Sequence, residues 1–213
     1  MITFDLETLP TDNPEIIAEL EKTIQAPGQY KKPESIAEWM EANKETALRE
    51  LVAKTSFDGI YGRIACIAWS DDAGIFASSP EHSELEAIEL FYAFIENYGE
   101  EKFCGHNLAG FDLPFLKHRS IILSIKPPKA LLNAMNAKPW DNCIADTMLM
   151  WNPNRDKYAS MDKLCRAFGI SGKGDFDGSM VAETWPKDPQ KVIDYCKDDV
   201  RRTIQIYKRI TFS

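Results

Sequence analysis

Apolar and acidic side chains alternate in a short segment near the N-terminus, Phe4-Asp5-Leu6-Glu7-Thr8. A period of two predicts a half-buried strand, in which the two carboxylates share one face and the apolar side chains anchor the other in a core. Carboxylates this close repel each other unless a cation lies between them, and carboxylates with water and phosphate are the usual ligands of Mg²⁺. An isolated Asp-x-Glu is commonly the wet face of an ordinary strand. The metal interpretation therefore depends on partners elsewhere in the chain.

The length and composition of the chain indicate one globular domain. Its 213 residues are enough for a full core and too few for two comfortable ones, so we expect residues 1–213 to form a single domain. No apolar run reaches membrane-spanning length, and we expect no membrane association. The five cysteines are odd in number and none forms a Cys-x-x-Cys pair, which predicts reduced core thiols in an intracellular, cytoplasmic protein and no zinc site.

The formal net charge of the chain is −8 at pH 7. Non-specific affinity for DNA comes mainly from Lys and Arg on phosphates, so this charge excludes a protein whose function rests on that affinity alone. It does not exclude an enzyme of nucleic acids whose metal ions neutralise both its own acids and the substrate. For such an enzyme the charge predicts weak, metal-dependent and salt-sensitive binding.

Hydrophobic periodicity and turn signals divide the chain into a meander of strands, alternating strands and helices, and closing helices. This order predicts an α/β fold with a mixed sheet flanked by helices. Residues 143–150 fit either a strand or a helix, and Ser35 is expected to cap the second helix. The expected strands cover 1–7, 61–69, 75–77 and 102–106, and the expected helices lie within 13–55 and 126–140 and over 83–98, 111–123, 160–168, 178–185 and 189–211.

A second candidate acid lies in Gly105-His106-Asn107-Leu108-Ala109-Gly110-Phe111-Asp112. A predicted strand ends there in a glycine-containing turn, and Asp112 opens the next helix. Functional groups are common at such junctions because a loop reaches a ligand while the scaffold stays rigid. The alternative is an acid that only complements the positive end of the helix dipole.

The last predicted helix carries a third candidate in Tyr195-Cys196-Lys197-Asp198-Asp199. Tyr195 and Asp199 are four residues apart and are therefore neighbours, at the edge of the apolar stripe of the helix. Asp199, and not Asp198, is then the acid that can enter a shared site. The alternative is a solvated helix edge with a tyrosine at its rim. The residues expected on the solvent-facing side are Asp194, Asp198, Arg201, Arg202 and Gln205.

Taken in order, these motifs resemble those of a known family. Asp-x-Glu in a first strand, Asn-x-x-x-Phe-Asp-x-Pro-Phe-Leu in the middle and Tyr-x-x-x-Asp in a late helix are similar to the DEDDy branch of the DEDD 3′–5′ exonucleases. Within this branch the chain resembles the stand-alone exonucleases similar to the proofreading domain of family B DNA polymerases. The resemblance covers the chain except about residues 10–58, and it extends to Ala145-Asp146-Thr147-Met148, residues 160–169 and Gly172-Lys173-Gly174-Asp175.

The resemblance implies a ribonuclease H-like fold, with a helical insertion over about residues 10–58 after the first strand. It implies hydrolysis of single-stranded DNA from the 3′ end, releasing nucleoside monophosphates. Tyr195 would orient the attacking water, because a phenol with an ordinary pKa of about 10 is a poor base at neutral pH. The branch that has His at this position is excluded. Two Mg²⁺ or Mn²⁺ ions would be held by the carboxylates of Asp5, Glu7, Asp112 and Asp199.

Four residues beside these acids are expected to contact the terminal nucleotide: Thr8, Leu9, Asn107 and Phe111. Thr8 and Leu9 would contribute backbone and apolar contacts. Asn107 and Phe111 would hold the sugar and the base, since stacking on an aromatic ring tolerates any base. Ordinary core packing is the alternative for Leu9 and Phe111.

Two other functions remain open at this point. An exoribonuclease is the first, because no residue identified in the sequence reads a 2′-hydroxyl. The second is a catalytically silent module of the same fold that binds nucleic acid or protein. Its signature would be loss of one of the acids or the tyrosine, and all are present. A calcium-binding module is disfavoured because the sequence contains no EF-hand loop.

Overall fold

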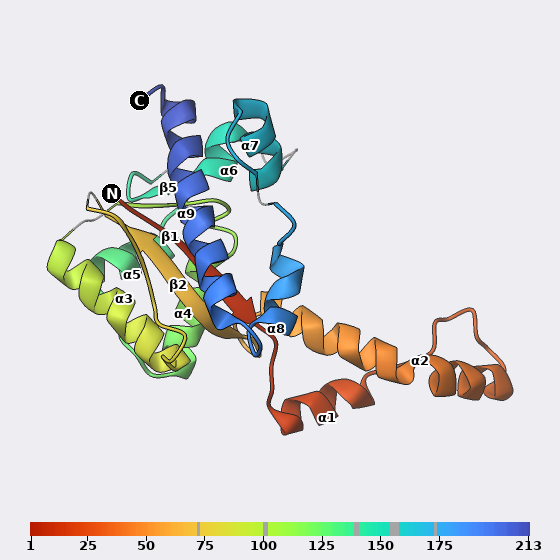
Figure 1. Ribbon diagram of the computed structural model, residues 1–213. Coiled ribbons are helices and arrows are strands. Elements are labelled where there is room, and N and C mark those ends of the chain that lie inside the picture. Colours follow the sequence, from red (N-terminus) through yellow and green to blue (C-terminus); the bar gives the residue numbers. More distant parts are fainter. Residues whose placement is uncertain (72, 100–101, 139–140, 154–157, 173) are drawn as a thin grey trace.

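The computed structural model describes residues 1–71, 73–99, 102–138, 141–153, 158–172 and 174–213. Its strands are β1 (Ile2–Leu9), β2 (Arg63–Ser70), β3 (Ile75–Ala77), β4 (Phe103–Gly105) and β5 (Ile144–Asp146). Across the described residues they form one five-stranded sheet in the order β3-β2-β1-β4-β5, with helices on both faces (Figure 1). β1 is antiparallel to β2 and parallel to β4, so the sheet is mixed, as predicted.

The helices fall into groups that cover opposite faces of the sheet. They are α1 (Pro14–Lys22), α2 (Pro33–Lys54), η1 (Thr55–Phe57), α3 (Glu84–Tyr98), α4 (Asp112–Ile122), α5 (Lys129–Met135), α6 (Thr147–Trp151), α7 (Met161–Phe168), η2 (Gly178–Met180), α8 (Val181–Thr184) and α9 (Pro189–Thr211). α3, α4 and α5 pack in the larger core on one face. α8 and α9 cover the other face, and α7 packs against α9.

The structure corrects the predicted cap of one helix and settles the ambiguous segment 143–150. α2 begins at Pro33 with Lys32 at its N-cap, so the expected cap by Ser35 is wrong. Proline is favoured in a first helical turn because it lacks an N–H that would need a partner, and Ser35 Oγ instead donates to the Lys32 carbonyl at 2.9 Å. Residues 143–150 contain both a strand and the start of a helix, because Asp146 ends β5 and caps α6.

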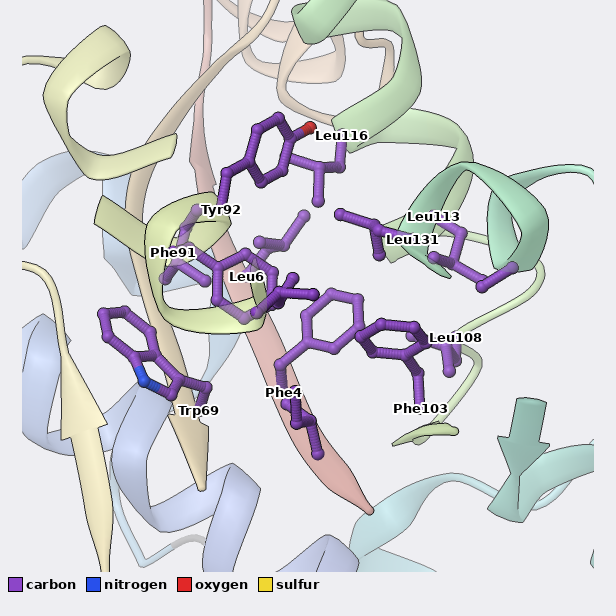
Figure 2. Packing of buried hydrophobic residues seen from close by; sticks show 14 of the residues in the cluster. Phe4, Leu6, Trp69, Phe91, Tyr92, Phe103, Leu108, Leu113, Leu116 and Leu131 are labelled. Carbon is purple, nitrogen blue, oxygen red and sulfur yellow. The ribbon is translucent and has the colours of Figure 1, made fainter. Parts of the chain in front are cut away.

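The larger core anchors β1 at the centre of the sheet. Phe4 and Leu6 are buried in it, as the period of two predicts (Figure 2). The Phe4 ring lies 5.1 Å from the ring of Phe91 in α3 and 6.2 Å from that of Phe103 in β4, between centroids. Full burial of such a side chain contributes about 1.5–3 kcal/mol. These contacts turn the acidic face of β1 toward α9.

A largely buried ion pair joins α3 to α4. Arg119 Nε and Nη2 donate to the Glu84 carboxylate at 2.8 and 2.9 Å, and Nη1 donates to the Gly59 carbonyl at 3.2 Å. Glu84 Oε1 also accepts from the Ile64 N–H at 2.8 Å. The pair therefore connects two helices, the start of β2 and the segment that follows η1.

α1 and α2 form a helical pair that follows β1, within the segment expected to be an insertion. Neither helix, each described in full, has a buried residue, and Figure 1 shows the pair extending away from the sheet. The pair returns to the body at η1. There Thr8 Oγ1 donates to the Ser56 carbonyl at 2.7 Å, and the Thr11 N–H donates to Thr55 Oγ1 at 2.8 Å. The insertion thus ends against the strand that carries the first acidic motif.

The cysteines are free thiols, as the sequence predicts. All five lie in the described part of the chain, and all except the half-buried Cys143 are buried. Among the described helices, none is both long and apolar enough to cross a membrane.

Loss of the buried arginine should destabilise the fold strongly. Arg119→Ala leaves the largely buried Glu84 carboxylate without its ion-pair partner, and breaking a fully buried pair costs about 3–5 kcal/mol of unfolding free energy, which is the upper limit expected here. Arg166→Ala is the control, because Arg166 pairs with Asp162 on an exposed helix surface, where the change should stay within about 1 kcal/mol. Urea denaturation measures both values. Equal losses for the two variants would contradict the role assigned to Arg119.

Candidate active site

One cleft brings the three acidic motifs together. It has a volume of about 210 Å³ and lies where the end of β1 meets η1, the loop between β4 and α4, η2 and α9. All four candidate carboxylates and the candidate tyrosine line it. The lining residues are Asp5, Leu6, Glu7, Thr8, Ser56, Phe57, His106, Asn107, Phe111, Asp112, Gly178, Tyr195 and Asp199.

Asp5 and Glu7 share one side of β1, as the period of two predicts. Glu7 is only 8% exposed and Asp5 is half-buried. Cys196 of α9 lies against this face, and its Sγ donates to the Asp5 carbonyl at 3.4 Å and to the Asp5 carboxylate at 3.6 Å. The register of β1 with β2 shifts after Glu7: Glu7 pairs with Cys66 and Thr8 with Ile64, so β2 has one extra residue at this point. A bulge interrupts the ladder and increases the local twist of the strand pair, and this one lies beside Glu7.

Asp112 reaches β1 through the backbone. The pairing of β1 with β4 ends at Thr3 in the described strands. N–H groups of alternate residues point to the same edge of a strand, so Leu6 N–H points to the edge where Ile2 N–H bonds to the Lys102 carbonyl. Leu6 N–H donates instead to Asp112 Oδ1 at 3.2 Å. The first residue of α4 thereby replaces the missing strand partner.

The Asp112 carboxyl is 3% exposed and lies among other acids. Burial raises its pKa well above the ordinary value, and the charge of Asp5 raises it further. Hydrogen bonds from the backbone, including that of Leu6, oppose the rise. Ionised Asp112 therefore favours a nearby cation.

The helical period correctly separates Asp199 from Asp198. Asp199 is buried and lines the cleft. The Asp198 side chain is half-exposed and pairs with Arg201 on the outer side of α9. A step of one residue turns a helix by about 100°, which is enough to move a side chain from the core to solvent.

Arg202 contradicts its predicted position on the solvent-facing side. Its guanidinium is buried, and Nη1 donates to Asp199 Oδ1 at 2.6 Å. Nε and Nη2 donate to the carbonyls of Ser171 and Gly172 at 3.3 and 3.0 Å. The loop after α7 supplies these carbonyls, so a buried place for the cation exists only in the folded protein. Its spacing of three from Asp199 was the sequence signal for the pair.

Tyr195 is buried beside Asp199, with its ring 5.0 Å from the ring of Phe176 in an edge-on contact. Burial raises the pKa of the phenol above its ordinary value, and the charges of Asp199 and Glu7 raise it further. The hydroxyl is therefore protonated at neutral pH. It can orient a water molecule but is a poor base, as the sequence predicts.

The Asp146 side chain holds the loop that carries Asn107 and Phe111 through hydrogen bonds to its backbone. The Asp146 carboxylate accepts from the Asn107 N–H at 3.1 Å and the Ala109 N–H at 2.9 Å. Asn107 has a φ of 65°, a conformation that Asn tolerates better than most residues. A Cβ at Gly110 would come within 2.4 Å of Asn107 Oδ1, so a larger residue there would displace the Asn107 side chain. Asn107 and Phe111 both line the cleft, whereas Asp146 was noticed in the sequence only as a family feature.

Thr8 and Leu9 have different environments. Thr8 lines the cleft, with its hydroxyl engaged by the Ser56 carbonyl. Leu9 is buried in the smaller core with Ala65 and Val181 and does not line the cleft. The Leu9 side chain therefore fits the alternative of ordinary core packing, because α8 covers that end of β1, and a contact of Leu9 with a nucleotide stays a prediction.

Five further lining residues were not predicted as site residues: Leu6, Ser56, Phe57, His106 and Gly178. His106 is adjacent to Asn107, which was a usable signal. Its Nδ1 lies 2.9 Å from Thr147 Oγ1 and its Nε2 lies 3.1 Å from the Ala159 carbonyl. Ser56 and Phe57 belong to the segment to which the sequence assigns no function, and no local pattern marks them. Lys173, in the loop noted for its resemblance, lies outside the described residues.

The donor atoms of the cleft fit a hard divalent cation. Asp5, Glu7 and Cys196 offer ligand atoms within 4.8 Å of one another. Burial raises the pKa of the Cys196 thiol well above its ordinary value, and the neighbouring Cys66 adds to the rise. Because the thiolate is the ligand form of cysteine, this leaves a set of carboxylate oxygens. Oxygen donors suit Mg²⁺ or Mn²⁺ better than a thiophilic metal.

Residues 63–213 match the model of a family described as predicted 3′–5′ exonucleases related to the exonuclease domain of PolB. The chain belongs to this family. The matched part of this family member contains Asp112, Tyr195 and Asp199 but begins after the first acidic motif. In the folded protein, Asp5 and Glu7 nevertheless line the same cleft as Asp112, Tyr195 and Asp199. No curated protein sequence matches the chain.

The fold of this family member is similar to that of a solved family B DNA polymerase, from the hyperthermophilic archaeon Pyrobaculum calidifontis. The TM-score is 0.61 at 16% sequence identity. The match covers 99% of this chain and 24% of the polymerase chain, so the chain spans about a quarter of that protein. With the mixed sheet and its flanking helices, this likeness confirms the expected ribonuclease H-like fold.

Asp112→Asn should stabilise the metal-free protein. Asn retains an oxygen for the Leu6 N–H and removes the charge that burial and Asp5 oppose. An acid whose pKa is raised by folding lowers stability once pH exceeds its unfolded pKa, so the gain should be larger at about pH 7 than at about pH 4. Each kcal/mol of relief raises Tm by about 2–4 °C.

Thermal melts in EDTA, repeated with Mn²⁺, measure both effects. Mn²⁺ should raise the Tm of the wild type and leave the Tm of Asp112→Asn nearly unchanged, since a ligand stabilises the state that binds it. A lower Tm for the variant than for the wild type in EDTA at neutral pH would contradict the electrostatic account.

Proposed function

We propose that this protein is a metal-dependent 3′–5′ exonuclease that releases nucleoside monophosphates from single-stranded DNA. The observation that carries the proposal is the convergence on one cleft of Asp5, Glu7, Asp112, Tyr195 and Asp199. They come from β1, α4 and α9, which are distant in sequence. The family relation to the exonuclease domain of PolB supports the 3′ end as the point of attack and DNA as the substrate.

The chemistry requires an activated water and stabilisation of charge on an anionic phosphodiester. Two divalent ions held by the four carboxylates would lower the pKa of the attacking water and offset the added charge. The chain itself sets the geometry. Leu6 N–H fixes Asp112, and Arg202 fixes Asp199. Tyr195, protonated because its pKa is raised, would orient the water through its hydroxyl without removing the proton.

Asn107 and Phe111 are proposed to hold the sugar and base of the terminal nucleotide. Both lie on the loop whose backbone is held by Asp146, so the chain itself positions them before a substrate binds. Stacking on an aromatic ring accepts any base, which suits an enzyme that removes nucleotides in sequence. The net charge of −8 opposes a polyanion, so binding should weaken when the divalent ions are removed.

End-labelled DNA and RNA oligonucleotides of one sequence test the proposal in Mg²⁺, Mn²⁺ or Ca²⁺ alone. We expect DNA to shorten from its 3′ end to mononucleotides with Mg²⁺ or Mn²⁺. Ca²⁺ is larger and accepts more flexible coordination, so it should bind without aligning the attack. Cleavage of a circular single strand, by protein free of contaminating nuclease, would overturn the exonuclease assignment. Faster hydrolysis of the RNA than of the DNA would overturn the proposal that DNA is the substrate.

Alanine at any of the four carboxylates should abolish hydrolysis while the protein remains folded. The variants are Asp5→Ala, Glu7→Ala, Asp112→Ala and Asp199→Ala, each of which removes a proposed metal ligand. Asp198→Ala is the matched control, because it removes the neighbouring acid whose side chain faces solvent. Product ladders and circular dichroism measure activity and folding. Loss of activity in Asp198→Ala with retention in a folded Asp199→Ala would refute the assigned helix face.

Tyr195→Phe should slow turnover by about 10²-fold or more without loss of fold or metal binding. The ring keeps its edge-on contact with Phe176, and only the hydroxyl that orients the water is removed. Turnover and Mn²⁺ affinity are measured beside Asp199→Asn, which should lose affinity. Turnover equal to that of the wild type, or a defect confined to Mn²⁺ affinity, would exclude the orienting role.

A further inference from the structure

A large exposed aromatic side chain stands beside the catalytic cleft and has no part in the function proposed so far. Phe57 of η1 is 73% exposed. Phe57 also lines a second cavity, of about 320 Å³. Thr8, Ser56, Phe57 and Gly178 line both cavities, so the second cavity adjoins the cleft at η1.

Hydrogen bonds at Thr55 and Ser56 hold the backbone that leads to Phe57. Thr55 is buried, and its Oγ1 accepts from the Thr11 N–H at 2.8 Å and donates to the Val52 carbonyl at 2.6 Å. The Ser56 carbonyl accepts from Thr8 Oγ1 at 2.7 Å, one residue beyond Glu7 of the acidic motif. A fixed backbone with an exposed ring favours contact with a ligand, because the entropy of ordering the loop is already lost on folding.

The second cavity is suited to a base and its phosphate. Ala53 and Ala182 contribute apolar wall, and Lys54 at the end of α2 offers a cation. Glu50 also lines the cavity, so the positive charge is local and not a general basic surface. These features fit one nucleotide of a single strand whose 3′ end already lies in the cleft.

We propose that Phe57 stacks on a nucleobase of the single-stranded substrate, and that the second cavity receives the adjoining nucleotide. The inference rests on the proposed exonuclease function and adds a specificity-determining residue to it. Phe57 precedes the part of the chain that matches the family, which begins at residue 63. The end of the helical insertion therefore supplies a substrate contact that the family match does not contain.

The test compares Phe57→Ala with Phe57→Trp and with Phe212→Ala. Phe212 is 98% exposed and lines neither cavity, so it controls for loss of an exposed ring. Affinity for a 5′-fluorescein-labelled single-stranded DNA oligonucleotide is measured by anisotropy in Ca²⁺, and KM and kcat are measured in Mn²⁺. Phe57→Ala should weaken affinity and raise KM by about 5- to 100-fold with little change in kcat. Phe57→Trp and Phe212→Ala should resemble the wild type, and all should keep the wild-type Tm.

A series of oligonucleotides with one abasic nucleotide at successive positions from the 3′ end identifies the stacked base. At one position the wild type should fall to the affinity of Phe57→Ala, and the variant should lose nothing further. If Phe57→Ala lowers the affinity by the same factor for every abasic oligonucleotide, the inference is overturned. It is also overturned if Phe57→Ala does not lower the affinity at all. Hydrolysis with no effect of Phe57 leaves the exonuclease proposal standing alone. Phe57-dependent binding without hydrolysis refutes the exonuclease proposal and supports the binding contact.

Discussion

The hydrogen bond from the Leu6 N–H to the Asp112 carboxylate exists because β1 extends beyond its parallel neighbour. β1 pairs with β4 at Ile2 and Thr3, and past that point its backbone edge is open on the side where α4 begins. The open edge provides a donor for a carboxylate and space for a cleft. Continued pairing to Leu6 would remove both. The site therefore depends on the difference in length between β1 and β4, two neighbouring strands of the sheet.

Bringing acids to this edge opposes stability, and the fold offsets only part of the effect. Arg202 lies against Asp199, and the N-terminus of α4 lies at Asp112. Asp112 nevertheless has a raised pKa, because burial and Asp5 disfavour its charged form. Proteins commonly depart from optimal stability where a function requires it. The same repulsion that weakens the metal-free fold favours capture of a divalent cation.

The helical insertion contributes to the cleft through its last turn and not through its length. α1 and most of α2 extend from the body, but the hydrogen bonds at Thr8 and Thr11 bring η1 to the end of β1. Ser56 and Phe57 thereby join a wall otherwise built from β1, the β4–α4 loop, η2 and α9. A segment with few contacts of its own is positioned by two side-chain hydroxyls.

Features of the site that depend on local periodicity could be predicted from the sequence. A period of two placed Asp5 and Glu7 on one face, and the helical period separated Asp199 from Asp198. The environments of Leu9, Arg202 and Phe57 depend on the tertiary structure and could not be predicted from local periodicity. Leu9 is core because α8 covers it, and Arg202 is buried because carbonyls of a distant loop satisfy its guanidinium. Phe57 lies at the cleft because η1 is bonded to β1. Periodicity reports which face a side chain occupies, whereas what covers that face is set by segments far away in the sequence.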